Sequence, residues 1–344
     1  MSMDVILFLL MHAICVASKV TMSGLSSGAD FIVQFHVSHS SLVRGVALFA
    51  GQPYHCGTVR FFAVDAIVPY ADPSVPFCMN CPNGTTLIYD HCKNVVADRI
   101  DSNALVRIAR RHEASGLIDK LINLRGSKIF LYRGQLDRTY LPGSVNGEFY
   151  SQLGAIVDAE YVDKIPSQHA WPTEDAGVKC GDTGAIENCG VDGTGEALQS
   201  LYDHALRPPA TAWNESNLFV FDQRPFRGDD LFATQLADSG YVYRPAACAQ
   251  TPSGCDLHVS LHGCNVNNYY EDAVRLLSLN RWAESNELII LWPKILPRTD
   301  ILATVQQQQG CWDAYGQTSP LYATKAAPQI QAVRAMIDSL VVVL

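Results

Sequence analysis

The stretch Gly24-Leu25-Ser26-Ser27-Gly28 constrains the fold of this chain more than any other part of its sequence. It lies between a short apolar run at 20–22 and a segment with helical spacing of apolar residues at 29–39. A serine on a sharp strand-to-helix turn needs small residues two positions to either side, because the backbone is crowded there and the hydroxyl must project clear of it. The two glycines meet that need around Ser26, and the backbone N–H of Ser27, at the helix start, would point at a developing oxyanion. The pattern predicts a nucleophile elbow, and a Gly- and Ser-rich turn without a catalytic role is the alternative.

Length and charge narrow the classes of protein to consider. With 344 residues and 48% hydrophobic content the chain can bury a large core, and no internal repeat or low-complexity linker divides it. The formal net charge of −9 argues against nucleic acid or an anionic membrane surface as a partner. We expect a monomer that acts on a neutral or apolar substrate.

Eleven cysteines are many for a cytosolic protein. Several lie in close pairs, such as Cys180 with Cys189 and Cys248 with Cys255, which favours disulfide bonds. A zinc site would need paired C-x-x-C modules, or one such module with two histidines, and only Cys78-Met79-Asn80-Cys81 has that spacing. We expect a disulfide-bonded protein that needs no metal ion and no organic cofactor.

The N-terminus resembles a secretory signal. Its apolar run from Val5 to Leu10 continues through 14–17 and is too short to span a bilayer. Asp4 and the lack of a basic residue before the run are unusual for a signal, so a buried first strand is the alternative. We expect a signal peptide at 1–18 of a secreted protein, followed by one catalytic domain at 19–344.

Two further side chains follow predicted strands in the order that a serine hydrolase of this kind needs. Asp137 lies a few residues past a strand, at the edge where open α/β sheets build their sites, and is the predicted triad acid. His169 lies in a loop after the next strand, from which an imidazole can reach back to the serine. The competing His55 and His91 precede the acid and would break the order Ser, Asp, His. Taken singly, Asp137 and His169 also fit structural roles, so the prediction depends on all three positions agreeing.

The remaining apolar segments alternate between strand and helix patterns, which predicts an α/β fold. Strands are predicted at 45–50, 128–132, 159–162, 217–222, 240–247, 257–264 and 288–292, and helices at 29–39, 94–118, 145–153, 193–206, 270–284 and 328–343. The stretch 51–92, rich in Pro, Gly and Cys, predicts a disulfide-stapled insertion over the sheet.

One strand stands in an unexpected place. The strand at 257–264 contains His262-Gly263, a pair that often marks the loop with the second oxyanion donor, and such a strand normally precedes the nucleophile. Here it follows His169 by nearly a hundred residues. A circular permutation, in which the usual N-terminal half of the sheet comes after the histidine, reconciles the two observations.

Six motifs occur in one order along the chain: Ser-Gly-Leu-Ser-Ser-Gly at 23–28, Phe-Ala-Gly-Gln-Pro-Tyr-His-Cys at 49–56, Gly134 to Asp137, His169 with Pro172-Thr173, Leu261 to Cys264, and Gly310-Cys311-Trp312-Asp313. In these motifs the chain resembles single-domain, fungal-type poly(3-hydroxybutyrate) depolymerases and their relatives, from residue 20 to the C-terminus. The resemblance implies a circularly permuted α/β-hydrolase fold in a single domain with disulfide-stapled insertions.

Carried over by position, the resemblance implies Ser26 as the nucleophile, Asp137 and His169 as its partners, and the backbone N–H groups of Ser27 and Cys264 as the oxyanion hole. It also suggests three disulfide bonds, and leaves open Cys15 and the pairing of four cysteines. The suggested bonds are Cys264–Cys311, Cys180–Cys189 and Cys248–Cys255, and the four open cysteines are Cys56, Cys78, Cys81 and Cys92.

The resemblance also bears on substrate. Members with polymer activity tend to carry a second aromatic after Cys-Trp-Asp, which contacts the polyester, whereas this chain has Ala314 followed by Tyr315. Trp312 and Tyr315 are the implied substrate-binding residues, and the preference for polymer or oligomer stays open.

Together these expectations predict a secreted serine esterase that transfers acyl groups from short hydroxyacid esters, polymeric or oligomeric. An esterase for plant-wall feruloyl or acetyl groups would have the same fold and triad and is the alternative. A binding protein that keeps the fold without catalysis is the rival from another class.

Overall fold

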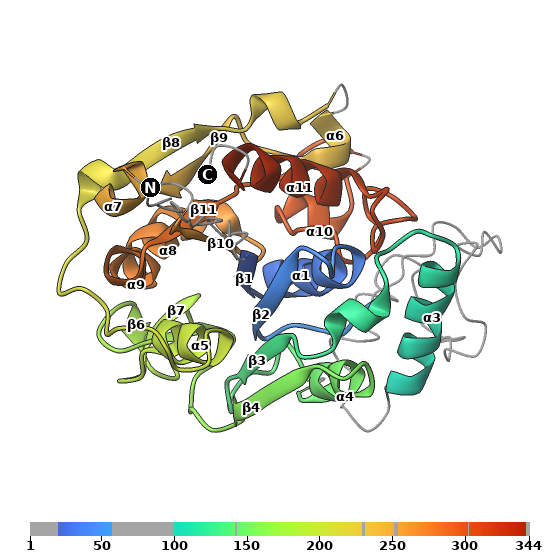
Figure 1. Ribbon diagram of the computed structural model, residues 1–344, viewed down its shortest axis with the longest axis horizontal. Coiled ribbons are helices and arrows are strands. Elements are labelled where there is room, and N and C mark those ends of the chain that lie inside the picture. The colour runs from blue at the N-terminus through green and yellow to red at the C-terminus, as the bar shows by residue number, and fades with distance from the viewer. Residues whose placement is uncertain are drawn as a thin grey trace, which may run out of the picture.

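The centre of the fold is an eight-stranded sheet, seen in the computed structural model, which describes residues 20–56, 100–141, 143–228, 231–250, 254–301 and 303–341. Its strands are β1 (Val20–Leu25), β2 (Val43–Phe49), β3 (Lys128–Arg133), β4 (Ile156–Val162), β8 (Leu218–Asp222), β9 (Ser239–Tyr243), β10 (Asp256–Leu261) and β11 (Leu288–Trp292) (Figure 1). They are arranged in the order β4-β3-β2-β1-β10-β11-β9-β8. In this order the strands from β4 to β11 run parallel, and β9 runs antiparallel to both of its neighbours, β11 and β8.

The strand order is that of a permuted sheet. Read from the edge strand β8, it runs β8-β9-β11-β10 and continues β1-β2-β3-β4. The second half of the chain therefore builds one half of the sheet, and the first half of the chain continues it. The join is the parallel pair of β1 and β10, from Val20 beside Leu257 to Gly24 beside Leu261. This arrangement confirms the predicted α/β fold with a permuted strand order.

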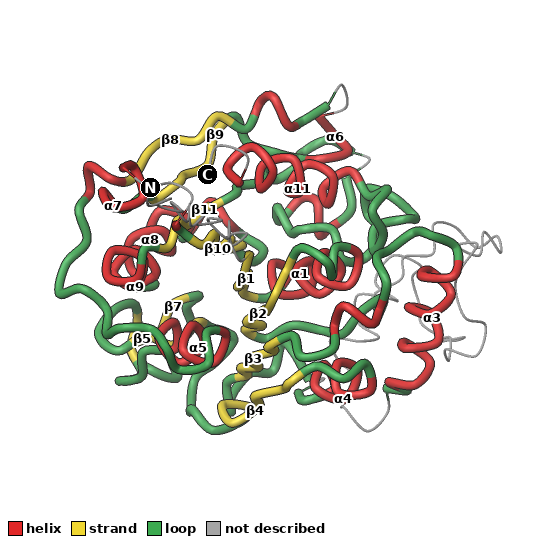
Figure 2. The backbone as a smooth tube through the Cα atoms, in the orientation of Figure 1, coloured by secondary structure: helices red, strands yellow, loops and turns green. Residues whose placement is uncertain are grey.

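Helices cover both faces of the sheet (Figure 2). One face carries α1 (Ser27–Ser38), α4 (Val145–Gln152) and α11 (Pro328–Val341), with α3 (Ser102–Ala114) beside α4. The other carries α5 (Gly193–Leu201), α8 (Tyr270–Leu276) and α9 (Leu279–Asn286). The short helices α6 (Leu231–Thr234), α7 (Ala246–Gln250) and α10 (Val305–Gln308) lie in the second half of the chain.

Alternate side chains of each strand enter two separate hydrophobic cores, one on each face. In β2, Val46 and Leu48 pack in the core under α1, whereas Ala47 and Phe49 pack in the core under α5. This alternation is the two-residue period of a strand, and burial on both faces explains why the strands read as continuous apolar runs. Both faces of the sheet are therefore covered, and loops extend from the ends of its strands.

Local capping fixes several helix starts. The carboxylate of Asp101 accepts a hydrogen bond from the N–H of Ala104 at the start of α3, and Asp192 caps α5 in the same way. At α10, Thr304 and Gln307 form a reciprocal capping box.

Several predicted boundaries were wrong. The helix predicted at 270–284 is two helices, because Ser278 has a left-handed φ of 59° that no continuous helix tolerates. The strand predicted at 240–247 ends at Tyr243, and its last two residues begin α7. The helix predicted at 193–206 ends at Leu201.

A second, three-stranded sheet was not predicted. It consists of β5 (Trp171–Thr173), β7 (Ile186–Asn188) and β6 (Val178–Lys179), directly after His169. The implied disulfides Cys180–Cys189 and Cys248–Cys255 are confirmed, and Cys56 is also disulfide-bonded. In the part of the chain that the structure describes, no helix is both long and apolar enough to cross a bilayer.

Some predictions fall outside the described residues. These are the signal peptide at 1–18, the fate of Cys15, the candidate His91, the part of the insertion from 57 to 92, and the pairing of Cys78, Cys81 and Cys92.

Candidate active site

Ser26 lies at a strained turn between β1 and α1. Its backbone has φ 57° and ψ −124°, a conformation that a non-glycine residue adopts only when its surroundings enforce it. A Cβ added at Gly24 would lie 2.7 Å from the carbonyl carbon of Gly28, and one at Gly28 would lie 2.5 Å from the carbonyl oxygen of His262. Both glycines are therefore required by close backbone contacts, as the sequence pattern predicts for an elbow. Ser27 is the first residue of α1, so its N–H precedes the internal hydrogen bonds of the helix.

The loop after β10 lies directly against this turn. A Cβ added at Gly263 would be 3.0 Å from the Cβ of Ser26, and the N–H of Gly263 donates to the hydroxyl of Tyr269 at 2.6 Å. The implied Cys264–Cys311 disulfide is confirmed. It ties the loop to the segment in which the backbone N–H of Trp312 donates to Ser27 Oγ at 3.3 Å.

His262 holds this loop through two hydrogen bonds. Its Nε2 accepts a hydrogen bond from the N–H of Ile295 at 3.2 Å, so its Nδ1 carries the proton and donates to the carbonyl of Gly263 at 2.7 Å. Burial lowers the pKa of His262 to about 3, outweighing the carbonyl contact that raises it. His262 is thus a neutral structural group at neutral pH.

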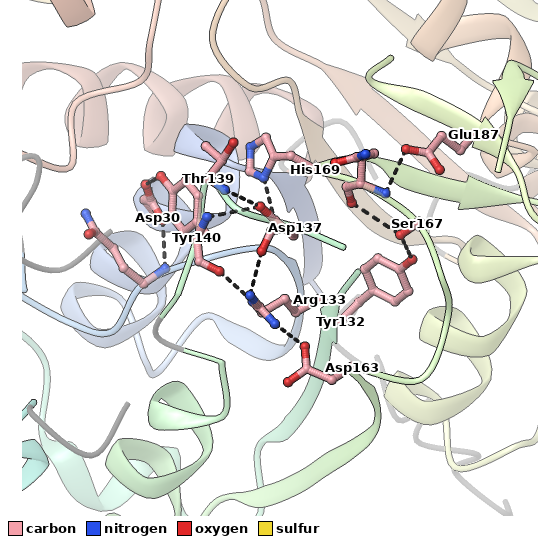
Figure 3. A network of polar contacts seen from close by, with 12 residues as sticks. Asp30, Tyr132, Arg133, Asp137, Thr139, Tyr140, Asp163, Ser167, His169 and Glu187 are labelled. Carbon is pink, nitrogen blue, oxygen red and sulfur yellow. Dashed lines mark hydrogen bonds and ion pairs between the residues drawn. The ribbon is translucent and has the colours of Figure 1, made fainter. Parts of the chain in front are cut away.

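Asp137 lies in the loop after β3, with both carboxylate oxygens occupied. Oδ2 accepts from Nδ1 of His169 at 2.8 Å, and Oδ1 accepts from the N–H groups of Thr139 and Tyr140 at 2.7 and 3.0 Å (Figure 3). Burial raises the pKa of Asp137, but the contact with His169 and the two N–H donors outweigh it and leave the pKa below its usual value. Arg133, the last residue of β3, donates to the carbonyl of Asp137 at 2.6 Å and closes the loop.

Backbone contacts hold the His169 loop to the Asp137 loop. The N–H groups of Gln135 and Leu136 donate to the carbonyls of Ile165 and Ser167 at 2.8 and 2.9 Å. On the far side, the carboxylate of Glu187 supports the loop (Figure 3).

Glu187 is fully buried in β7. It accepts from the N–H of Gln168 at 2.9 Å and from that of Gly181 at 2.6 Å. Burial raises the pKa of Glu187 more than these two donors lower it. The three-stranded sheet and its Cys180–Cys189 disulfide therefore support the loop of His169.

The structure joins Asp137 to His169 by a hydrogen bond but does not join His169 to Ser26 in the same way. Nε2 of His169, the nitrogen that faces away from Asp137, is buried without a hydrogen-bond partner. The competing His55 is buried, and its ring packs against those of Tyr54 and His112. The catalytic roles of Ser26, Asp137 and His169 stay a prediction.

Trp312 and Tyr315, the implied substrate-binding residues, are buried in the structure. Both side chains have 0% exposure. Trp312 packs against Phe31 of α1 and against His262, with ring centroids 5.1 and 5.4 Å apart. Tyr315 donates its hydroxyl to Asp30, also on α1. Both residues thus support the elbow helix from beneath.

Four residues around the site were missed in the sequence: Asp30, Arg133, Tyr140 and Glu187. Arg133 directly precedes the Gly134 motif, and Glu187 lies between paired cysteines, so their positions carried a signal. For Asp30 and Tyr140 nothing in a single sequence shows that they meet, because 110 residues separate them.

No protein-family model matches the chain. The chain is 32% identical over 329 residues to a poly(3-hydroxybutyrate) depolymerase of Delftia acidovorans, an alignment that covers 93% of this chain and 59% of that protein. It is 27% identical over 318 residues to a polyhydroxybutyrate depolymerase of Talaromyces funiculosus, covering 87% of this chain and 82% of that one. The crystal structure of PHB depolymerase from Penicillium funiculosum superposes with a TM-score of 0.76 at 25% identity, over 95% of this chain and 96% of that chain. A serine-to-alanine variant of PHB depolymerase, complexed with R3HB trimer, superposes equally well, with a TM-score of 0.76.

The chain is similar to poly(3-hydroxybutyrate) depolymerases over nearly its whole length. The resemblance indicated by the six motifs is therefore confirmed, and so is the fold. The chain spans 59% of the length of its Delftia relative.

The described part of this chain offers few groups that could bind a metal ion. Cys180, Glu187 and Cys189 bring ligand-type atoms within 4.8 Å of one another. The two sulfurs are joined in a disulfide, however, and a thiolate is the form that binds zinc.

Proposed function

We propose that this protein is a serine esterase that hydrolyses hydroxybutyrate ester bonds in a polymer or oligomer. The observation that carries the proposal is the partly buried hydrogen bond between Asp137 and His169, on the same sheet edge as the strained Ser26. Two relatives are named as depolymerases of this polyester, and a similar structure is described as a complex with R3HB trimer.

In this proposal Ser26 is the nucleophile. Its Oγ attacks the ester carbonyl carbon while Nε2 of His169 takes the hydroxyl proton. Collapse of the tetrahedral intermediate breaks the bond to the leaving alcohol, which receives that proton from His169. Water then attacks the acyl-enzyme by the same route, releases the acid and restores the Ser26 hydroxyl.

Asp137 keeps the imidazole in the productive tautomer. Because its Oδ2 accepts from Nδ1 of His169, the proton is held on Nδ1 and Nε2 is left as the base. The lowered pKa of Asp137 keeps the carboxylate charged at neutral pH, which stabilises the imidazolium when it forms.

The negative charge on the substrate oxygen is assigned to the N–H groups of Ser27 and Cys264. Ser27 begins α1 and Cys264 follows Gly263, whose backbone lies against Ser26. Each such donor contributes about 3 kcal/mol of transition-state stabilisation. Catalytic hydrogen bonds often shorten only in the substrate complex, so we expect Nε2 of His169 to pair with Ser26 when substrate binds.

An apolar cavity next to the elbow favours a small group. Its walls include Leu25, which precedes Ser26, and Trp171, which follows His169 by two residues. Its volume is about 10 Å³, room for about one water molecule. A methyl branch such as that of hydroxybutyrate suits this space far better than an aromatic feruloyl group.

The disulfide bonds are typical of a protein in an oxidising compartment. From them and from the apolar N-terminus we propose that the protein is secreted.

The deciding experiment compares Ser26→Ala with Ser27→Ala, assayed on hydroxybutyrate oligomers, feruloyl esters and acetyl esters. We expect hydrolysis of the oligomers, loss of fluorophosphonate labelling in Ser26→Ala only, and substantial activity in Ser27→Ala, whose backbone N–H remains. Equal loss in both variants would contradict the choice of nucleophile, and a preference for feruloyl or acetyl esters would replace the substrate.

A further inference from the structure

Tyr140 contacts both members of the Asp137–His169 pair. Its N–H donates to Oδ1 of Asp137 at 3.0 Å, and its ring lies flat on the imidazole of His169, with centroids 5.1 Å apart and planes 9° apart. Its hydroxyl points the other way and donates to Oδ2 of Asp30 (Figure 3). One residue therefore links the acid and the base to the helix that follows the nucleophile.

Asp30 fixes the other end of this link. It lies in the first turn of α1, is fully buried, and its N–H donates to the carbonyl of Ser26 at 2.9 Å. Its carboxylate also accepts from the N–H of Gln52 at 2.7 Å and from the hydroxyl of Tyr315. A carboxylate at a helix N-terminus is further stabilised by the helix dipole. The position of Asp30 relative to Ser26 is thus set by the backbone itself.

We propose that Tyr140 and Asp30 are positioning residues that set the distance between Ser26 and the Asp137–His169 pair. The proposal rests on the proposed function of this site. His169 and Ser26 come from loops on separate strands and share no hydrogen bond in the structure. Their approach therefore depends on contacts such as this one, and catalysis requires placement to a few tenths of an ångström.

Two conservative variants test this link. Tyr140→Phe keeps the ring on His169 and the N–H to Asp137 but removes the hydroxyl, and Asp30→Asn keeps the shape of the acceptor but removes its charge. We expect each to lower kcat by about 10- to 100-fold with KM changed by less than about 3-fold, because ground-state binding is untouched while alignment is lost. The double variant should be no slower than the slower single variant, because both changes break one link.

Tyr150→Phe is the matched control. Tyr150 is fully buried, and its hydroxyl pairs with Nδ1 of His36 at 3.1 Å, near the other end of the same helix α1. Like Tyr140→Phe, this variant removes a buried hydroxyl that contacts α1, so its thermal stability should fall comparably while kcat stays at the wild-type value. A role in packing alone would give Tyr140→Phe and Tyr150→Phe the same kcat.

A measurement without turnover completes the test. The NMR signal of the Nδ1 proton of His169, held by Asp137, should broaden or shift in Tyr140→Phe and in Asp30→Asn but not in Tyr150→Phe. An unchanged signal, a kcat equal to that of the control, or losses that multiply in the double variant would each overturn the positioning role. If the wild-type protein neither hydrolyses hydroxybutyrate oligomers nor reacts with a fluorophosphonate, the proposed function fails, and the NMR comparison decides the link between Tyr140 and Asp30 alone. If Tyr140→Phe does not fold, Asp30→Asn decides both readouts.

Discussion

Removing the Cys264–Cys311 disulfide should affect catalysis more than folding. The perturbation is the double variant Cys264→Ala/Cys311→Ala, which keeps the backbone N–H of Cys264. The bond closes a loop with a sequence separation of 47, and the chain-entropy estimate gives about 4 kcal/mol for such a loop. A chain of 344 residues with cores on both faces of its sheet has enough buried surface to stay folded after that loss.

The catalytic effect follows from what the bond holds. It joins the loop of the proposed oxyanion donor to the segment of Trp312, which is itself bonded to Ser27. A second tie remains, because the N–H of Asn265 donates to the carbonyl of Gln309 at 2.6 Å. The loop should therefore loosen rather than unfold. Because one oxyanion donor is worth about 100- to 1,000-fold in kcat, we expect a loss approaching 100-fold.

The Cys248–Cys255 bond provides the control. It has a sequence separation of 7, for which the same estimate gives about 2 kcal/mol, and it lies in the core under α1 and α11 rather than in a site loop. Cys248→Ala/Cys255→Ala should lower the free energy of unfolding in urea and leave kcat unchanged. Equal kcat in the two double variants, or a Cys264–Cys311 variant that unfolds without a specific loss of kcat, would refute the reasoning.

Three further predictions concern single groups. Asp137→Asn should lower kcat by about 10⁴-fold, since the amide holds the wrong tautomer of the imidazole, and a loss below about 10-fold in steady-state assays would argue against the triad. Gly28→Ala should lower both the melting temperature and kcat, because its Cβ would lie 2.5 Å from the carbonyl oxygen of His262, and wild-type values for both would show that the elbow is less constrained than we describe. Burial lowers the pKa of His258 and of His262 to about 3, so between pH 6.5 and that value the unfolded chain binds protons that the folded chain does not. The free energy of unfolding in urea should therefore fall on acidification below pH 6.5, by about 1.4 kcal/mol per pH unit for each histidine, and a flat profile from pH 7 to 5 would contradict this.

The sequence was most informative where a local rule requires a particular residue. Gly24 and Gly28 could be read as an elbow because no side chain fits at either position, and in the structure backbone atoms lie within 3 Å of a Cβ added at each. The buried strands could be read because both faces of the sheet are covered. The permutation followed from the place of His262-Gly263 after His169.

Tertiary contacts decided the rest. The break between α8 and α9 at Ser278 could not be predicted, because no Gly or Pro marks it. The left-handed conformation of this serine is imposed by its surroundings. The resemblance implies substrate binding by Trp312 and Tyr315, yet in the structure both side chains are fully buried and contact α1. The meeting of Tyr140 with Asp30 depends on the packing of one loop against one helix, which no periodicity encodes.

The permuted order makes one strand pair critical for the proposed site. The predicted elbow follows β1 and the proposed oxyanion loop follows β10, so these two segments lie far apart in sequence and are aligned through the register of that pair. Buried His258 of β10 bridges two positions of β1, with Nδ1 2.8 Å from Oγ1 of Thr21 and Nε2 2.7 Å from Oγ of Ser23. A shift of one residue would turn both hydroxyls to the opposite face and leave the imidazole unpaired in the core. The buried histidine therefore selects one register, and that register sets Gly263, in the loop of the proposed oxyanion donor, against Ser26.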